Sequence, residues 1–106
     1  MDKNDIIFKI ITYAADASDN AKAAIEEAKK FNFEKADELI EKANESYLVS
    51  HDEQSKLITL EGNGQKNDLN VLLIHALDHL TMSNIRIENA KNLIELYKEV
   101  NKLKNN

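Results

Sequence analysis

The chain has no cysteine and no proline among its 106 residues, and its only two glycines lie close together. Without cysteine, disulfide bonds, thiolate metal sites and a cysteine nucleophile are all excluded. Without proline, and with Gly62 and Gly64 as the one strong break, the other stretches run uninterrupted and predict long helices. Chemistry at a site must therefore use histidine, carboxylate or hydroxyl groups.

Positive charge and long apolar runs are also scarce. Arg86 is the only arginine and the formal net charge is −5, whereas proteins that bind phosphate backbones concentrate basic residues on one face. A nucleic-acid partner is therefore not expected. No run of about 18 apolar residues is present, which argues against insertion into a membrane. Residues 2–5 are polar and partly acidic rather than the start of an export signal, so we expect a cytoplasmic protein.

Apolar residues recur at three- and four-residue spacing in three stretches, the pattern of helices that each bury one face. The first stripe consists of Ile7, Ile10, Ile11, Ala14, Ala17, Ala21, Ala24, Ile25 and Ala28. The second consists of Ala36, Leu39, Ile40, Ala43, Tyr47, Ser50, Gln54, Leu57 and Ile58. The third consists of Leu72, Leu73, Ala76, Leu80, Ile87, Ala90, Ile94, Tyr97 and Leu103. The many alanines of the first stripe allow close helix approach.

Capping residues mark where these helices begin and end. Asn32 is a candidate N-cap of the second helix after a tight turn, and the glycine pair can end that helix in a left-handed conformation. Asn67, Asp68 or Asn70 can cap the third helix, and residues 102–106 are expected to fray. These short connections predict an all-α fold, an antiparallel up-down-up three-helix bundle in a single domain spanning residues 1–106.

The third helix carries a second face. Its members at helical spacing are Val71, Ile74, His75, Asp78, Met82, Ile85 and Asn89. A lone three-helix bundle needs only one buried stripe per helix, so a second stripe predicts packing against another copy of the chain. We therefore expect a homo-oligomer.

The most informative group lies on this second face. His75, Asp78 and His79, at positions i, i+3 and i+4, share one side of the helix, a costly arrangement unless each polar group has a partner or a task. The residues alone leave two interpretations. Two imidazoles one turn apart can bind Zn²⁺, with Asp78 or a residue of another helix, such as His51, as a further ligand. Alternatively, the chain can be a noncatalytic helical interaction module.

The string from Leu72 to Met82 reads LLIHALDHLTM. It resembles the His-Ala-Gln-Asp-His-Leu-Met signature of the lactose/cellobiose-type enzyme IIA family of the phosphoenolpyruvate-dependent sugar phosphotransferase system. The resemblance covers nearly the whole chain and implies a three-helix subunit with this motif in its third helix. Further similar segments are Ile6 to Ala17, Asn32 to Leu39, His51 with Gln54 and Leu57, and Ile94 to Tyr97.

The resemblance implies a phosphotransferase component that acts as a phosphocarrier. It implies that His75 accepts a phosphoryl group from the protein HPr and passes it to a cysteine of enzyme IIB, which acts with a membrane enzyme IIC in the uptake of a lactose-, cellobiose- or chitobiose-type sugar. A neutral imidazole is a competent nucleophile at cellular pH. We expect His79 to support the phosphoryl group, with Gln54 and His51 as further residues of the cleft.

Asp78 carries a separate expectation. The resemblance implies a homotrimer, a nine-helix bundle in which the matching aspartates converge on the threefold axis around a metal ion. Three carboxylates in a poorly solvated core repel one another, so they must bind a cation or take up protons. Hard oxygen ligands favour Mg²⁺, which we expect as one ion per trimer.

Two departures from the family pattern bear on the site. Leu77 stands where the pattern has glutamine, which removes an amide that could contact a neighbouring site. The family's Gly-acid-Ala-Arg-Ser segment reads Ala15-Asp16-Ala17-Ser18-Asp19 here, so its glycine and its arginine are both missing. Asp16 within this segment is expected either to face solvent or to belong to the cleft.

Overall fold

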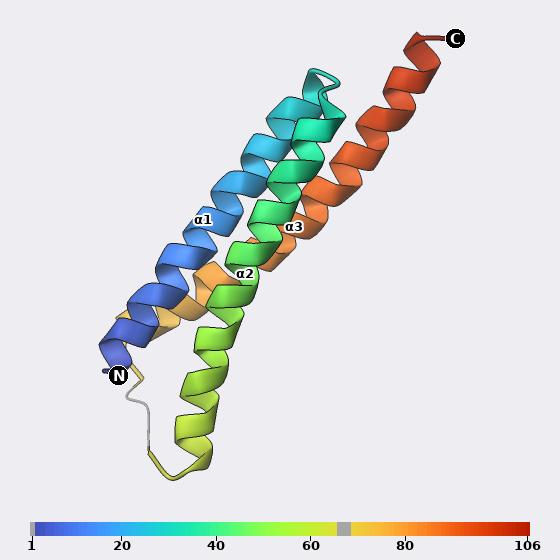
Figure 1. Cartoon of the computed structure of the whole chain (residues 1–106). Coiled ribbons are helices and arrows are strands. Elements are labelled where there is room, and N and C mark those ends of the chain that lie inside the picture. Colours follow the sequence, from blue (N-terminus) through green and yellow to red (C-terminus); the bar gives the residue numbers. More distant parts are fainter. Residues whose placement is uncertain (1, 66–68) are drawn as a thin grey trace.

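The computed structural model in Figure 1 describes residues 2–65 and 69–106. Three helices, α1 (Lys3–Lys29), α2 (Phe33–Gly62) and α3 (Val71–Lys104), lie side by side, and α2 runs opposite to the other two (Figure 1). The bundle measures 62 × 20 × 18 Å. The predicted all-α, up-down-up three-helix bundle is confirmed. None of these helices combines the length and apolar character needed to cross a membrane.

The turn between α1 and α2 is as short as expected, but its capping differs. α2 starts directly after Asn32, as predicted, and Phe31 before it has a positive φ of 63°. The Asn32 side chain makes no capping bond to the helix; its amide instead donates to Glu27 Oε2 at 3.3 Å. The predicted position of the N-cap is confirmed, but Asn32 does not supply the side-chain hydrogen bond that usually accompanies this position.

The end of α2 and the start of α3 follow the sequence signals. Gly64 adopts a φ of +93°, and the N–H of Gln65 donates to Leu60 O at 3.0 Å, so a glycine in the left-handed region closes α2 as predicted. The Asn70 side chain accepts from the N–H of Leu73 at 2.9 Å and caps α3. The alternative caps Asn67 and Asp68 lie outside the described residues.

The C-terminal residues are more ordered than expected. α3 continues to Lys104, so the predicted fraying from residue 102 is wrong for the first three of those residues. Lys102 pairs with Glu99 at 3.2 Å, and cations in the last turn suit the negative end of the helix dipole. These local interactions extend the helix nearly to the end of the chain.

The core is built largely from alanine. Nine alanines are fully buried, and α1 alone contributes five of them at three- or four-residue spacing: Ala14, Ala17, Ala21, Ala24 and Ala28. Small side chains let helix backbones approach closely, and α1 packs against both α2 and α3 more extensively than those two pack against each other. The first predicted stripe therefore places α1 at the centre of the packing.

The two faces of α3 separate as predicted. Its inner face is buried and consists of Leu73, Ala76, Leu80, Ser83, Ile87, Ala90 and Ile94. The outer face is exposed and consists of Val71, Ile74, His75, Asp78, Met82, Ile85 and Asn89. Two residues assigned to core stripes are exposed instead, Leu103 at 73% and Ile58 at 60%. Leu103 lies in the last turns of α3, and Ile58 points away from the side of α2 that buries Leu57.

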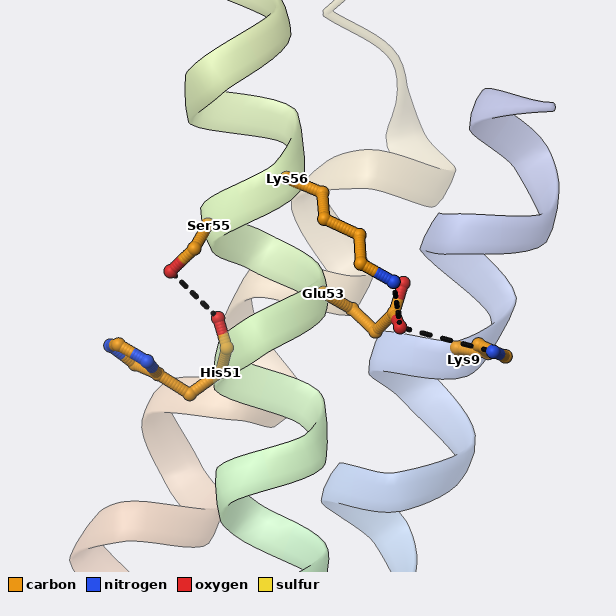
Figure 2. Close-up of polar contacts among 5 residues, drawn as sticks. All are labelled: Lys9, His51, Glu53, Ser55 and Lys56. Atoms are coloured by element: carbon orange, nitrogen blue, oxygen red, sulfur yellow. Dashed lines mark hydrogen bonds and ion pairs between the residues drawn. The ribbon is translucent and has the colours of Figure 1, made fainter. Parts of the chain in front are cut away.

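A buried carboxylate takes a place in the core that the sequence did not suggest. Glu53 on α2 is only 4% exposed, and its side chain points toward α1 (Figure 2). Its Oε1 lies 2.8 Å from Lys56 Nζ and 3.8 Å from Lys9 Nζ, and Oε2 has no hydrogen-bond partner within the described part of the chain. Burying an ionised oxygen without a partner is unfavourable.

Glu53→Met is expected to stabilise the fold by about 1 to 3 kcal/mol, because an apolar side chain of similar volume removes the desolvated carboxylate. Lys9 and Lys56 stay half-exposed, so the substitution leaves no buried cation behind. Urea unfolding of the wild type and the variant at one protein concentration measures the change. A loss of stability greater than 1 kcal/mol in the methionine variant would show that the two ion pairs outweigh the desolvation.

Candidate functional site

The two histidines of α3 contact each other directly. His75 lies one turn into the helix and His79 one turn further on, and their Nε2 atoms are 3.0 Å apart. The rings are nearly perpendicular, at 87°, with centroids separated by 4.4 Å. One nitrogen must donate and the other accept, so the contact requires one protonated and one free Nε2. The sequence spacing predicted this shared face.

The histidine pair is positioned to be reached and to hold an anion. His75 is exposed and His79 half-buried. α3 begins at Val71, so the His75 ring lies near the positive end of the helix dipole, which favours an added anion by about 0.3 to 1 kcal/mol. The half-buried ring fixes the geometry and the exposed ring meets the solvent.

A hollow of about 300 Å³ lies beside His79, between α1 and α3. Its walls are Ala15, Ser18 and Asp19 from α1, and Asp78, His79, Met82 and Arg86 from α3. Ser18 and Arg86 also line the next hollow along the same groove. The α1 segment that departs from the family pattern therefore lies next to the histidine motif. Ser18 stands at the position where the family pattern has arginine, and Arg86 of α3 lines the same hollow as Ser18.

Gln54 and His51 lie elsewhere in the chain. Gln54 lines a different hollow, between α2 and α3, together with Leu77. His51 is exposed, its ring centroid is 6.0 Å from that of Tyr47, and it points to the side of α2 opposite Glu53 (Figure 2). Among the described residues, no hydrogen bond or ring contact joins either of them to the α3 histidines. A single chain does not assemble the cleft that the sequence predicted, and the roles of both residues stay predictions.

Asp16 is exposed, which is one of its two predicted environments, and it also joins two helices. Its Oδ2 accepts hydrogen bonds from the Ser46 hydroxyl on α2 and, at 3.2 Å, from the Asn20 amide. This residue therefore ties α1 to α2. Asp19, three residues later, is the acid of this segment that lines the hollow beside His79. The sequence did not single out Asp19 or Arg86, because neither lies in the histidine motif.

The arrangement of acids and imidazoles bears on metal binding. Asp78 is exposed on the outer face of α3, with no ion pair or hydrogen bond inside the described ranges. Across residues 2–65 and 69–106, no three histidine, aspartate or glutamate side chains gather closely enough to hold a metal ion. The zinc alternative based on His75 and His79 therefore lacks a third ligand within one chain.

Known proteins resemble this chain over most of its length. The family described as "PTS system, Lactose/Cellobiose specific IIA subunit" matches residues 5–98. The lactose-specific EIIA component of the PTS system of Staphylococcus epidermidis is 37% identical over 92 residues, which are 87% of this chain and 88% of that protein.

Solved structures agree with these sequence relatives. The crystal structure of the cellobiose-specific enzyme IIA from Bacillus anthracis has a TM-score of 0.93 and 35% identity, with 96% of this chain and 94% of that chain covered. The IIA chitobiose protein of Escherichia coli, in a solution structure of its complex with HPr, has a TM-score of 0.80 and 27% identity, with 95% and 98% covered.

The fold and the paired histidines, together with these relatives, define an enzyme IIA component of the phosphotransferase system, a phosphotransferase. Within that class, the chain belongs to the lactose/cellobiose-specific IIA family. The resemblance drawn from the Leu72 to Met82 string is confirmed.

Proposed function

We propose that the chain is a phosphocarrier that accepts a phosphoryl group from phosphorylated HPr on His75 and passes it to a cysteine of enzyme IIB. The observation that carries the proposal is the exposed His75 ring, in contact with a second imidazole at 3.0 Å near the start of α3. The similarity to a IIA protein in complex with HPr supports HPr as the donor. A cytoplasmic location and a membrane enzyme IIC as the final partner belong to the same proposal.

In this proposal the reacting nitrogen is His75 Nε2, the atom that lies 3.0 Å from His79 Nε2. When His79 Nε2–H donates to His75 Nε2, the lone pair on His75 Nε2 is the nucleophile, and its attack releases the hydrogen bond. The P–N bond of the donor breaks as the new P–N bond to His75 Nε2 forms. In the second step a cysteine thiolate of enzyme IIB attacks phosphorus, so that a P–S bond forms and the P–N bond to His75 breaks. Each step conserves the phosphoryl group.

His79 acts by hydrogen bonding in this proposal. Once His75 Nε2 carries the phosphoryl group, the Nε2–H of His79 lies next to it and can donate to a phosphoryl oxygen. Phosphoryl transfer depends chiefly on positioning and charge neutralisation, so such a donor aids both steps. Gln54 and His51 can belong to the cleft only through a neighbouring copy, because within one chain neither contacts the histidines.

The outer face of α3 supports the proposed homotrimer. Its apolar residues are well exposed in the single chain, from Met82 at 37% through Ile85 at 46% and Ile74 at 53% to Val71 at 83%. Contiguous exposed apolar residues on one helix face are typical of a surface that another subunit covers. Packing three copies through α3 would give the nine-helix bundle and bring the Asp78 side chains together.

Asp78 fits the proposed Mg²⁺ site in its chemistry. Its carboxylate has no protein partner within the described residues and lies on the same exposed face, and Mg²⁺ prefers such hard oxygen ligands. One chain supplies one such carboxylate, so an ion would need the equivalent residues of other copies. The ion would neutralise charges that otherwise repel.

Asp78→Leu is therefore expected to keep or strengthen the trimer while abolishing bound magnesium, because it replaces repelling carboxylates with apolar contact. Sedimentation equilibrium gives the oligomeric mass, and elemental analysis of dialysed protein gives the metal content. Asp52→Leu, at an exposed aspartate of α2, is the matched control and should retain the metal. A leucine variant that is monomeric or unfolded would contradict the axial position.

The proposed function is tested by incubating the chain with phosphoenolpyruvate, enzyme I and HPr and measuring its intact mass. The expected result is a gain of one phosphoryl group per chain that is lost in acid, as a phosphoramidate requires. The group should also disappear when enzyme IIB is added, with its appearance on the IIB cysteine. No gain of mass under conditions in which HPr itself is phosphorylated would refute the proposal.

A further inference from the structure

Arg86 lies on the groove beside the histidine pair without a partner of its own. Within the described ranges its guanidinium makes no ion pair or hydrogen bond, although Asp19 and Asp78 line the same hollow. The lysines of the described part of the chain differ from it, because eight of them form ion pairs: Lys9, Lys29, Lys30, Lys35, Lys56, Lys91, Lys98 and Lys102. The only arginine of the chain therefore keeps its N–H donors available.

Helix geometry aligns Arg86 with the reacting histidine. It follows His75 by eleven residues, which is about three turns, so both side chains leave the same side of α3 about 16 Å apart along the axis. A long helical side chain leans toward the helix N-terminus and covers roughly one turn. Arg86 therefore reaches the hollow beside His79 and stops short of a phosphoryl group on His75 of the same chain.

A protein that docks on His75 would nevertheless cover Arg86. A typical specific interface buries about 800 Å² on each partner, a patch roughly 30 Å across. We propose that Arg86 binds a carboxylate of HPr when HPr docks to deliver its phosphoryl group. This inference rests on the proposed function and adds a specific docking residue to it.

Charge complementarity is the reason for assigning a carboxylate to this position. The planar guanidinium matches a carboxylate with two parallel hydrogen bonds, and no acid of the chain itself uses it. The chain carries a net charge of −5, and Asp19 of α1 lines the same hollow as Arg86. The Arg86 guanidinium therefore attracts a carboxylate of HPr, whereas the acidic residues around it repel one. This difference fixes the orientation in which HPr docks.

Isothermal titration with unphosphorylated HPr tests the proposal. Arg86→Gln is expected to weaken HPr binding about 10-fold at low salt, with a smaller difference at high salt, because the lost contact is a screened charge pair. Arg86→Lys should lie between the two. Lys91→Gln removes the same charge from α3 at a residue already paired with Glu88, and it should bind HPr like the wild type.

Kinetics and oligomeric mass separate this role from the alternatives. In the phosphotransfer assay Arg86→Gln should raise KM for phosphorylated HPr and leave kcat unchanged. Equal affinity of wild type and Arg86→Gln for HPr overturns the inference, as does a changed oligomeric mass, which would make Arg86 a contact between copies. If the wild type is phosphorylated but binds HPr with the same affinity as Arg86→Gln, only the role of Arg86 is refuted. If the wild type is not phosphorylated at all, the proposed function is refuted.

Discussion

His75→Gln is expected to abolish phosphoryl acceptance completely while leaving the helices intact. Glutamine keeps a polar side chain at an exposed position of α3 but has no nucleophilic ring nitrogen, so no P–N bond can form. The measurement is the intact mass after incubation with phosphoenolpyruvate, enzyme I and HPr, with circular dichroism as the check on folding. A folded glutamine variant that still gains an acid-labile phosphoryl group would assign the acceptor to another residue.

His79→Leu is the comparison, one turn away on the same helix face. It removes the Nε2–H that we place next to the phosphoryl group and supplies no other donor, so we expect phosphoryl transfer about 100-fold slower, the usual effect of losing one positioned donor. The full gain of one phosphoryl group per chain should still be reached with time. Loss of acceptance in this variant, with acceptance kept in His75→Gln, would reverse the assignment of the two rings.

Ala24→Leu is expected to destabilise the fold by about 3 kcal/mol or more. Ala24 is completely buried where α1 meets the other helices, and it packs in a cluster with Ala21, Ala28 and Ala36. Leucine adds three carbon atoms where no room exists, so the helices must separate or the side chains must take strained rotamers. Urea unfolding followed by circular dichroism, at one protein concentration, measures the loss.

Ala23→Leu provides the comparison for this substitution. Ala23 precedes Ala24 on α1 but is only partly buried, so its leucine can extend toward solvent. We expect a change within about 0.5 kcal/mol, since leucine and alanine are both good helix formers. If Ala24→Leu were tolerated as well as Ala23→Leu, the close approach of α1 to its neighbours would not be what stabilises the bundle.

Helical periodicity allowed the fold to be predicted because each helix is long and follows one spacing. The two stripes of α3 show this best, since their phases differ and the structure buries one and exposes the other. The wrong assignments of buried residues on α2 arose because apolar side chains were assumed to be buried and charged ones exposed. On α2 the buried side contains Ser50, Glu53 and Leu57, and continuing their three- and four-residue spacing would have identified Glu53 and excluded Ile58.

The candidate site was only partly predictable. His75 and His79 could be paired because residues four apart on one helix are neighbours, and this contact depends on no other element. The surroundings of the pair depend on which helix faces which groove. The sequence could not show that Gln54 and Leu77 line one hollow, or that Asp19 and Arg86 line the hollow beside His79, because periodicity alone does not order three helices around an axis.

The separate faces of α3 have an evolutionary consequence. No side chain belongs both to its buried stripe and to its outward one, so substitutions that change what docks on the helix need not disturb folding. Selection for partners and selection for stability can then act on different codons. A chain built in this way can change most of its residues and keep its backbone. Its identity to the Bacillus anthracis relative is only 35%, yet the two structures match with a TM-score of 0.93.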